Sequence, residues 1–292
     1  MIPLPRPSVT TREAYLACLE MVRDPATKEA YEAAIEFIEQ AESQFEQHAQ
    51  RLDLHLLNVA DFRPEGVNSG TLLKITSKDL SEKLYDDRMA HPKSSGRKIY
   101  DQIKLAAPND ACPLCGIRRV STLDHYLPKA HFATLSVTPL NLIPACSECN
   151  KVKLDVAPTR KEEQTLFPYF EDVSEAQWIQ CSVIAEKPAI LRFTVSEPAH
   201  CSRVLINRVR HHFEVFKLGE LYSHHANNDL ASIRWLLRKL FDQLGDQGVR
   251  TYLRDHAESA RKVGINSWKV AMYEALAESE WYCTGGFDAQ AI

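Results

Sequence analysis

Glycine is scarce in this sequence, long apolar runs are absent, and neither sign of charge is in strong excess. Glycine accounts for 10 of 292 residues and helix-forming residues dominate, which favours a mostly helical fold. No run of about 18 apolar residues occurs, so no membrane-spanning helix is predicted. The first residues, Met1–Pro7, lack the apolar segment of a secretory signal. We therefore expect a cytoplasmic protein without a membrane contact.

The net charge of −4 argues against nucleic-acid binding by the whole surface. The local distribution is more informative, because residues 101–161 carry eight basic and five acidic side chains. The rest of the chain carries 27 basic and 34 acidic side chains. A basic island in an acidic protein suits a local phosphate contact, although chance variation explains a difference of this size equally well.

The eight cysteines do not have the distribution of a disulfide framework. Four of them form two Cys-x-x-Cys pairs, Cys112 with Cys115 and Cys146 with Cys149, and the other four stand singly along the chain. In a cytosolic protein this paired spacing indicates metal binding. The single cysteines are predicted to be small buried hydrophobic residues.

Three regions follow from the sequence pattern. We predict a helical region over residues 1–107, a metal-binding module over 108–164, and a hairpin followed by helices over 165–292. The expected elements are a helix capped by Thr10 and Glu13, a long helix over 29–54, helices near 77–89 and 96–106, and a hairpin of 178–184 with 189–195.

The paired cysteines predict a structural zinc site. Each Cys-x-x-Cys turn can direct two thiolates at one ion, and Zn²⁺ in structural sites is held by four such ligands. Gly116, directly after Cys115, supplies the permissive backbone that such a turn needs. The two pairs lie about 30 residues apart, so a shared ion would join a short hairpin to the start of a helix and stabilise a module too small for its own core.

Between the cysteine pairs lie residues suited to phosphodiester hydrolysis. Asp124 and His125 offer a metal ligand and a general base side by side. Neighbours on a strand point to opposite faces, so either a local bend brings both into one cleft or the two serve different shells. Asn141 is placed to hold the imidazole through its amide or the local backbone. Asn150 follows Cys149, and its amide oxygen suits Mg²⁺ or Mn²⁺.

Three lysines accompany these residues. Lys151 and Lys153 share a predicted helix with Asn150, and Lys129 follows the Asp-His pair. We predict that all three contact nucleic-acid phosphates.

This string of residues, about 42 long, resembles the HNH nuclease family, in its zinc-bearing branch with the ββα-metal fold. The family pattern is a cysteine pair, Asp-His with a proline three residues later, Asn-Leu, and a second cysteine pair followed by His or Asn. The resemblance implies that His125 is the general base and that Asn141 orients it. It also implies that Asp124 and Asn150 hold the catalytic metal. The last position is Asn rather than His, which leaves the choice between Mg²⁺ and Mn²⁺ open.

A weaker resemblance links the motif and the segment Asn266–Leu276 to HNH proteins of anti-phage defence systems of the Septu type. In those systems the nuclease is paired with an ATPase, so an ATPase partner is implied. Simple packing of a helix also accounts for the apolar residues of this segment. We expect the helical flanks, Met1–Ala107 and Ala199–Ile292, to recognise a partner rather than to perform catalysis.

The sequence therefore predicts a mostly α protein with a small embedded ββα-metal, treble-clef-like HNH module and a short β-hairpin. The function predicted is that of an HNH endonuclease acting on DNA, a substrate that the resemblance alone favours over RNA. The alternative is a non-catalytic zinc module that binds DNA or a protein, which would not require Asp124, His125, Asn141 and Asn150 in register. A Cys-x-x-Cys oxidoreductase is disfavoured because neither pair lies in a βαβ pattern.

Overall fold

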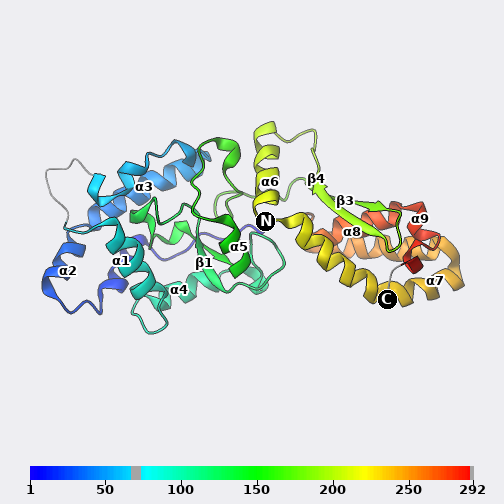
Figure 1. Cartoon of the computed structure of the whole chain (residues 1–292), viewed down its shortest axis with the longest axis horizontal. Coiled ribbons are helices and arrows are strands. Elements are labelled where there is room, and N and C mark those ends of the chain that lie inside the picture. Colours follow the sequence, from blue (N-terminus) through cyan, green and yellow to red (C-terminus); the bar gives the residue numbers. More distant parts are fainter. Residues whose placement is uncertain (67–73, 290–292) are drawn as a thin grey trace. The chain divides into compact units, whose positions relative to one another are not determined.

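In the computed structural model, residues 1–66 and 74–289 are described. The chain forms two compact units, a first unit of Met1–Asp172 and a second unit of Val173–Ile292 (Figure 1). The described residues are mostly helical, as predicted, with two small two-stranded sheets. Among them, no helix combines the length and the apolar character needed to cross a membrane.

The first unit begins with three helices. Helix α1 (Thr11–Leu19) starts with the predicted capping box, in which the side chains of Thr10 and Glu13 each accept a hydrogen bond from the other's main-chain N–H. Helices α2 (Pro25–Glu32) and α3 (Ile35–Arg51) replace the single helix predicted over 29–54, which was wrong. Ala33 and Ala34 separate the two helices, and Ala34, with φ −90° and ψ −6°, is the N-cap of α3.

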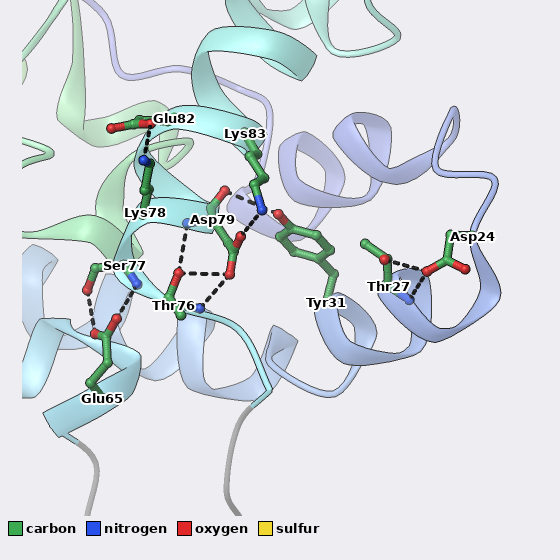
Figure 2. A network of polar contacts seen from close by, with 10 residues as sticks. All are labelled: Asp24, Thr27, Tyr31, Glu65, Thr76, Ser77, Lys78, Asp79, Glu82 and Lys83. Atoms are coloured by element: carbon green, nitrogen blue, oxygen red, sulfur yellow. Dashed lines mark hydrogen bonds and ion pairs between the residues drawn. The ribbon is translucent and has the colours of Figure 1, made fainter.

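A network of polar contacts fixes the start of the next helical element (Figure 2). Glu65 accepts hydrogen bonds of 2.6 Å from both the main-chain N–H and the hydroxyl of Ser77. Thr76 and Asp79 make the reciprocal contacts of a capping box, because the side chain of each accepts a hydrogen bond from the main-chain N–H of the other. The element that follows, η4 (Asp79–Ala90), is a twelve-residue π-helix at the place where an α-helix over 77–89 was predicted. Long π-helices are rare and often lie at functional sites.

Helix α4 (Arg97–Lys104) confirms the helix predicted near 96–106. A glycine precedes it because the chain passes close to two neighbours at Gly96. A Cβ atom there would lie 2.6 Å from the main-chain oxygen of Arg88 and 2.7 Å from Cys18 Sγ. The core of the first unit gathers buried residues of α1, α3, η4 and α4 around Leu123 of the first strand.

The middle of the chain folds as two strands and a helix. Strand β1 (Thr122–His125) pairs antiparallel with β2 (Leu142–Ala145), with Asp124 opposite Ile143 and His125 opposite Leu142. Helix α5 (Ser147–Lys153) follows directly after β2. Short 3₁₀ segments connect the larger elements of both units: Leu54–Leu56, Val59–Phe62, Pro64–Gly66, Pro108–Asp110, Ala133–Leu135, Pro139–Asn141, Lys161–Glu163 and Gly286–Ala289.

The second unit opens with the predicted hairpin, in which β3 (Ile179–Ile184) pairs antiparallel with β4 (Ile190–Val195). The helices are α6 (Arg203–Val215), α7 (Leu218–Val263), α8 (Trp268–Glu278) and α9 (Glu280–Cys283). Helix α7 is kinked at Gly245, whose φ of +66° lies in the region that favours glycine. Helix α8 packs against both α7 and β3 (Figure 1). Within the segment Asn266–Leu276, the buried residues are Val270, Ala271, Met272, Tyr273 and Leu276.

Candidate metal centre and active-site pocket

The four paired cysteines lie together. The sulfur atoms of Cys112, Cys115, Cys146 and Cys149 are all within 4.8 Å of one another, and the four side chains are buried. All eight cysteines of the chain are free thiols. Four sulfurs around one Zn²⁺ at about 2.3 Å would be about 3.8 Å apart, so the cluster fits such an ion. The structure therefore contains a buried four-cysteine group that could hold a metal such as zinc.

The local backbone explains how each pair reaches this position. In the first pair the chain turns back at Gly116, whose φ is +72° and whose N–H donates to the carbonyl of Cys112 at 2.7 Å. In the second pair Cys146 is the N-cap of α5, and its sulfur accepts a hydrogen bond from the N–H of Cys149 at 3.3 Å. A helix start can stabilise thiolate character through its partial positive charge.

The thiols perturb one another strongly. The hydrogen bond from Cys112, followed by those from the other two cysteines, holds the pKa of Cys115 well below its usual value. The pKa of Cys149 is raised, again with Cys112 as the largest cause. Four sulfurs this close cannot all be thiolates without a counter-charge, and a divalent cation supplies one.

A pocket of about 520 Å³ lies beside the cysteine cluster, and five residues predicted to act in catalysis or binding line it. They are Asp124, His125, Lys129, Asn150 and Lys151. Asp124 and His125 are neighbours at the end of β1, yet both line this one pocket. The pocket thus joins the end of β1 to the helix that the second cysteine pair begins.

His125 is almost fully enclosed. Its Nε2 atom lies 2.8 Å from the main-chain oxygen of Ser136, and the ring of Tyr85 packs edge-on against the imidazole with 4.4 Å between ring centres. Burial lowers the pKa of His125 to about 3. Because a carbonyl oxygen can only accept, Nε2 carries the hydrogen and Nδ1 keeps its lone pair. The side chain is therefore a neutral base of fixed tautomer.

Asp124 is paired with a lysine from α5. The Nζ atom of Lys153 lies 3.1 Å from Asp124 Oδ2, and both side chains are buried. Burial raises the pKa of Asp124 above its usual value, and the Lys153 ammonium offsets part of the rise. A buried carboxylate that already attracts a positive charge is a suitable ligand for a hard cation.

Asn141 is completely buried and holds the backbone that follows His125. Its Oδ1 accepts from the N–H of Leu127 at 2.8 Å, and its Nδ2 donates to the oxygens of Leu127 and Leu135. The imidazole itself is bonded to Ser136, the residue after Leu135. Asn141 therefore bonds the main chain two residues after His125 and at the residue before Ser136.

The predicted phosphate-contacting lysines differ in their surroundings. Lys129 is engaged with Asp86, with Nζ 2.7 Å from both carboxylate oxygens, and also donates to the oxygen of Ser81. Lys153 points inward to Asp124. Lys151 is exposed at the rim of the pocket. Lys151 is thus the one of these three whose charge faces solvent without an ion pair in the described part of the chain.

Several residues in and around the pocket were not predicted from the sequence. Tyr85 and Asp86 come from η4, in the flank that was expected to take no part in catalysis, and they line the pocket beside His125 and Lys129. Ser136 supplies the carbonyl that fixes the imidazole. About 40 residues separate η4 from His125 in sequence, and no local pattern signals their contact.

Comparison with known proteins gives one informative match. The chain is 28% identical over 220 residues to Protein ea31 of Escherichia phage lambda, a match that covers 70% of this chain and 73% of that protein. The name of that protein states no activity. No model of a known protein family matches the chain, and no solved structure matches it.

Proposed function

We propose that this chain is a metal-dependent HNH endonuclease that hydrolyses phosphodiester bonds in DNA. The observation that carries the proposal is the shared pocket of Asp124, His125 and Asn150 beside the four-cysteine cluster. Strand β1 bears Asp124 and His125, and α5 bears Asn150. With β2 between them, these elements follow one another in the ββα order that the HNH resemblance implies. A non-catalytic zinc module has no need of a buried base and a buried carboxylate in one pocket.

The proposed reaction assigns one proton transfer to His125. A water molecule attacks the phosphorus atom, and its proton passes to Nδ1, which keeps a lone pair because Nε2 donates to Ser136. A P–O bond to the leaving group breaks as the new P–O bond forms. Asn141 acts at a distance, by holding the backbone on either side of the base.

The proposed catalytic ion is Mg²⁺ or Mn²⁺, held by Asp124 and Asn150. The two residues line one pocket and offer a carboxylate and an amide oxygen, which are hard ligands of the kind these ions prefer. When bound, such an ion stabilises negative charge on the phosphate and on the leaving oxygen. The proposed Zn²⁺ is separate and structural, held by the four cysteines.

We assign partner recognition to the second unit, Val173–Ile292, because every residue proposed for catalysis or metal binding lies in the first unit. An ATPase partner in anti-phage defence is the proposal that follows from the resemblance to Septu-type proteins. If the isolated chain cleaves DNA at full rate and no protein co-purifies with it from its native host, this assignment is wrong.

The test of the nuclease proposal is cleavage of supercoiled plasmid by the full chain in Mn²⁺ or Mg²⁺. We expect nicked and linear products, with no product after EDTA is added. Added zinc alone should not restore the reaction, because the four-cysteine site is proposed to be structural. Cleavage that persists in excess EDTA, or no cleavage of DNA or RNA with any divalent ion, would count against the proposal.

A further inference from the structure

Lys153 carries a buried ammonium group at the place where a cation would bind. Its Nζ atom lies 3.1 Å from Asp124 Oδ2 and 2.5 Å from the main-chain oxygen of His125. The side chains of Lys153 and Asp124 are each 8% exposed. Lysine is rarely buried unless it is paired, so the two residues stabilise each other's charge.

The neighbouring lysine on the same helix makes no such contact. Lys151 precedes Lys153 by two residues on α5, lines the pocket that Asp124 and His125 also line, and is exposed. The inward position of Lys153 is therefore specific to its place at the end of α5, beside the end of β1. Lys153 and Lys151 carry the same charge, but the Lys153 ammonium lies beside Asp124 whereas the Lys151 side chain faces solvent.

A divalent ion and the Lys153 ammonium compete for the same carboxylate. An ion bound by Asp124 would lie about 2.1 Å from its oxygen, so an ammonium at its present 3.1 Å from Oδ2 would lie within about 5 Å of the ion. Two positive charges so close in a buried site repel each other strongly, because screening by solvent is weak there. Occupancy by the ion therefore requires the ammonium to leave.

We propose that Lys153 is an internal counter-ion of the proposed catalytic metal site, which a divalent ion must displace from Asp124 in order to bind. This inference rests on the proposed function, since it takes Asp124 as a metal ligand. Lys153 is then a positioning residue that sets the concentration of divalent ion at which the site fills. It keeps the buried carboxylate paired until the ion arrives.

The experiment measures Mn²⁺ binding to the full, zinc-loaded chain by electron paramagnetic resonance of the free ion, at pH 8. Removal of the competing charge in Lys153→Met and Lys153→Gln should tighten Mn²⁺ binding by at least about tenfold, because the ion no longer has to break a buried ion pair. Lys153→Arg keeps the charge and should not show this gain. The control Lys151→Met makes the same change of net charge and should alter the dissociation constant by less than about twofold.

The shift of melting temperature with added Mn²⁺ gives a second readout. We expect a larger shift for Lys153→Met and Lys153→Gln than for the wild type. In these variants Asp124 has lost its lysine partner, so the bound ion neutralises a carboxylate that is otherwise unpaired. Zinc content shows whether each variant has kept its fold, and Lys153→Gln replaces Lys153→Met if the latter fails this control.

Mn²⁺ binding by Asp124→Asn distinguishes a wrong counter-ion role for Lys153 from a wrong metal site. If Asp124→Asn abolishes Mn²⁺ binding but the two neutral variants at Lys153 bind no tighter than the wild type, the counter-ion role is wrong and the metal site stands. If Asp124→Asn leaves Mn²⁺ binding unchanged, or if the wild-type chain and the neutral variants bind none, both proposals are wrong.

Discussion

The Nε2 atom of His125 lies 2.8 Å from the main-chain oxygen of Ser136, eleven residues further along the chain. This contact and the burial of the ring determine which nitrogen is free and in which charge state. An exposed histidine titrates near pH ~6.5, whereas burial lowers the pKa of His125 to about 3. The imidazole is therefore neutral throughout the physiological range.

A pH–rate profile tests this charge state. Titration of an ordinary imidazole would raise a base-catalysed rate about tenfold between pH 5.5 and 7.5. Because the pKa of His125 lies below that range, we expect the single-turnover cleavage rate to change less than about twofold over it. The contrary result is a wild-type rate that rises with pH around pH ~6.5 while the residual rate of His125→Gln does not. It would show that the imidazole is more accessible to water than this structure indicates.

The four-cysteine cluster makes a prediction about metal content and stability. Purified protein should contain about one zinc ion per chain, and Cys146→Ser should lose it and unfold the module, because binding energy at such sites is folding energy. Elemental analysis and thermal denaturation measure the two effects. Cys201→Ser is the matched control, since Cys201 lies outside the cluster, and it should keep the zinc. Folded wild-type protein without zinc would contradict this assignment.

Asn141→Ala should act on stability as well as on rate. The substitution leaves the N–H of Leu127 and the oxygens of Leu127 and Leu135 without their buried partner. Each such group costs about 1–3 kcal/mol, so we expect the free energy of unfolding to fall by several kcal/mol in total. Urea denaturation measures the loss.

The exposed Asn228 of α7 provides the control for this change, and Asn228→Ala should alter stability by less than about 0.5 kcal/mol. An Asn141→Ala chain of wild-type stability with reduced cleavage would mean that the amide acts on the imidazole and not on the backbone.

Lys151 and Lys129 should differ in their effect on DNA binding. Lys151 is exposed at the pocket, so Lys151→Ala should lower the slope of log affinity against log salt by about 0.9 in magnitude, the loss of one phosphate contact. Lys129 is paired with Asp86, so Lys129→Ala should leave the slope nearly unchanged and lower the melting temperature slightly. Fluorescence anisotropy at several salt concentrations measures the slopes, and equal losses in both variants would refute the distinction.

Local sequence patterns were sufficient to predict the elements that depend on nearby residues. The Thr10–Glu13 capping box and the β3–β4 hairpin could be read from the chain, and the spacing of the cysteines predicted a cluster that the structure brings together. These features depend on residues a few positions apart or on a fixed metal-ligand spacing. The shared pocket of Asp124 and Asn150 was expected for the same reason, since the cysteine pairs tie their segments to each other.

Contacts between distant segments could not be predicted. Nothing around residue 85 signals that Tyr85 packs on His125, because that contact depends on the π-helical path of η4 and on the polar network that fixes its start (Figure 2). The inward direction of the Lys153 side chain could not be predicted either. A lysine near the end of a helix normally faces solvent, and the inward position of Lys153 depends on the buried charge of Asp124.

The proposed nuclease activity depends on His125 as its general base. Its most direct test compares single-turnover plasmid cleavage by the wild type and His125→Ala at saturating Mn²⁺, with zinc content and DNA affinity measured on the same samples. General-base catalysis contributes about 10²–10⁴-fold, so we expect a rate loss of at least about 10²-fold with one zinc retained and DNA affinity within about twofold of wild type. Cleavage by His125→Ala at the wild-type rate would contradict it.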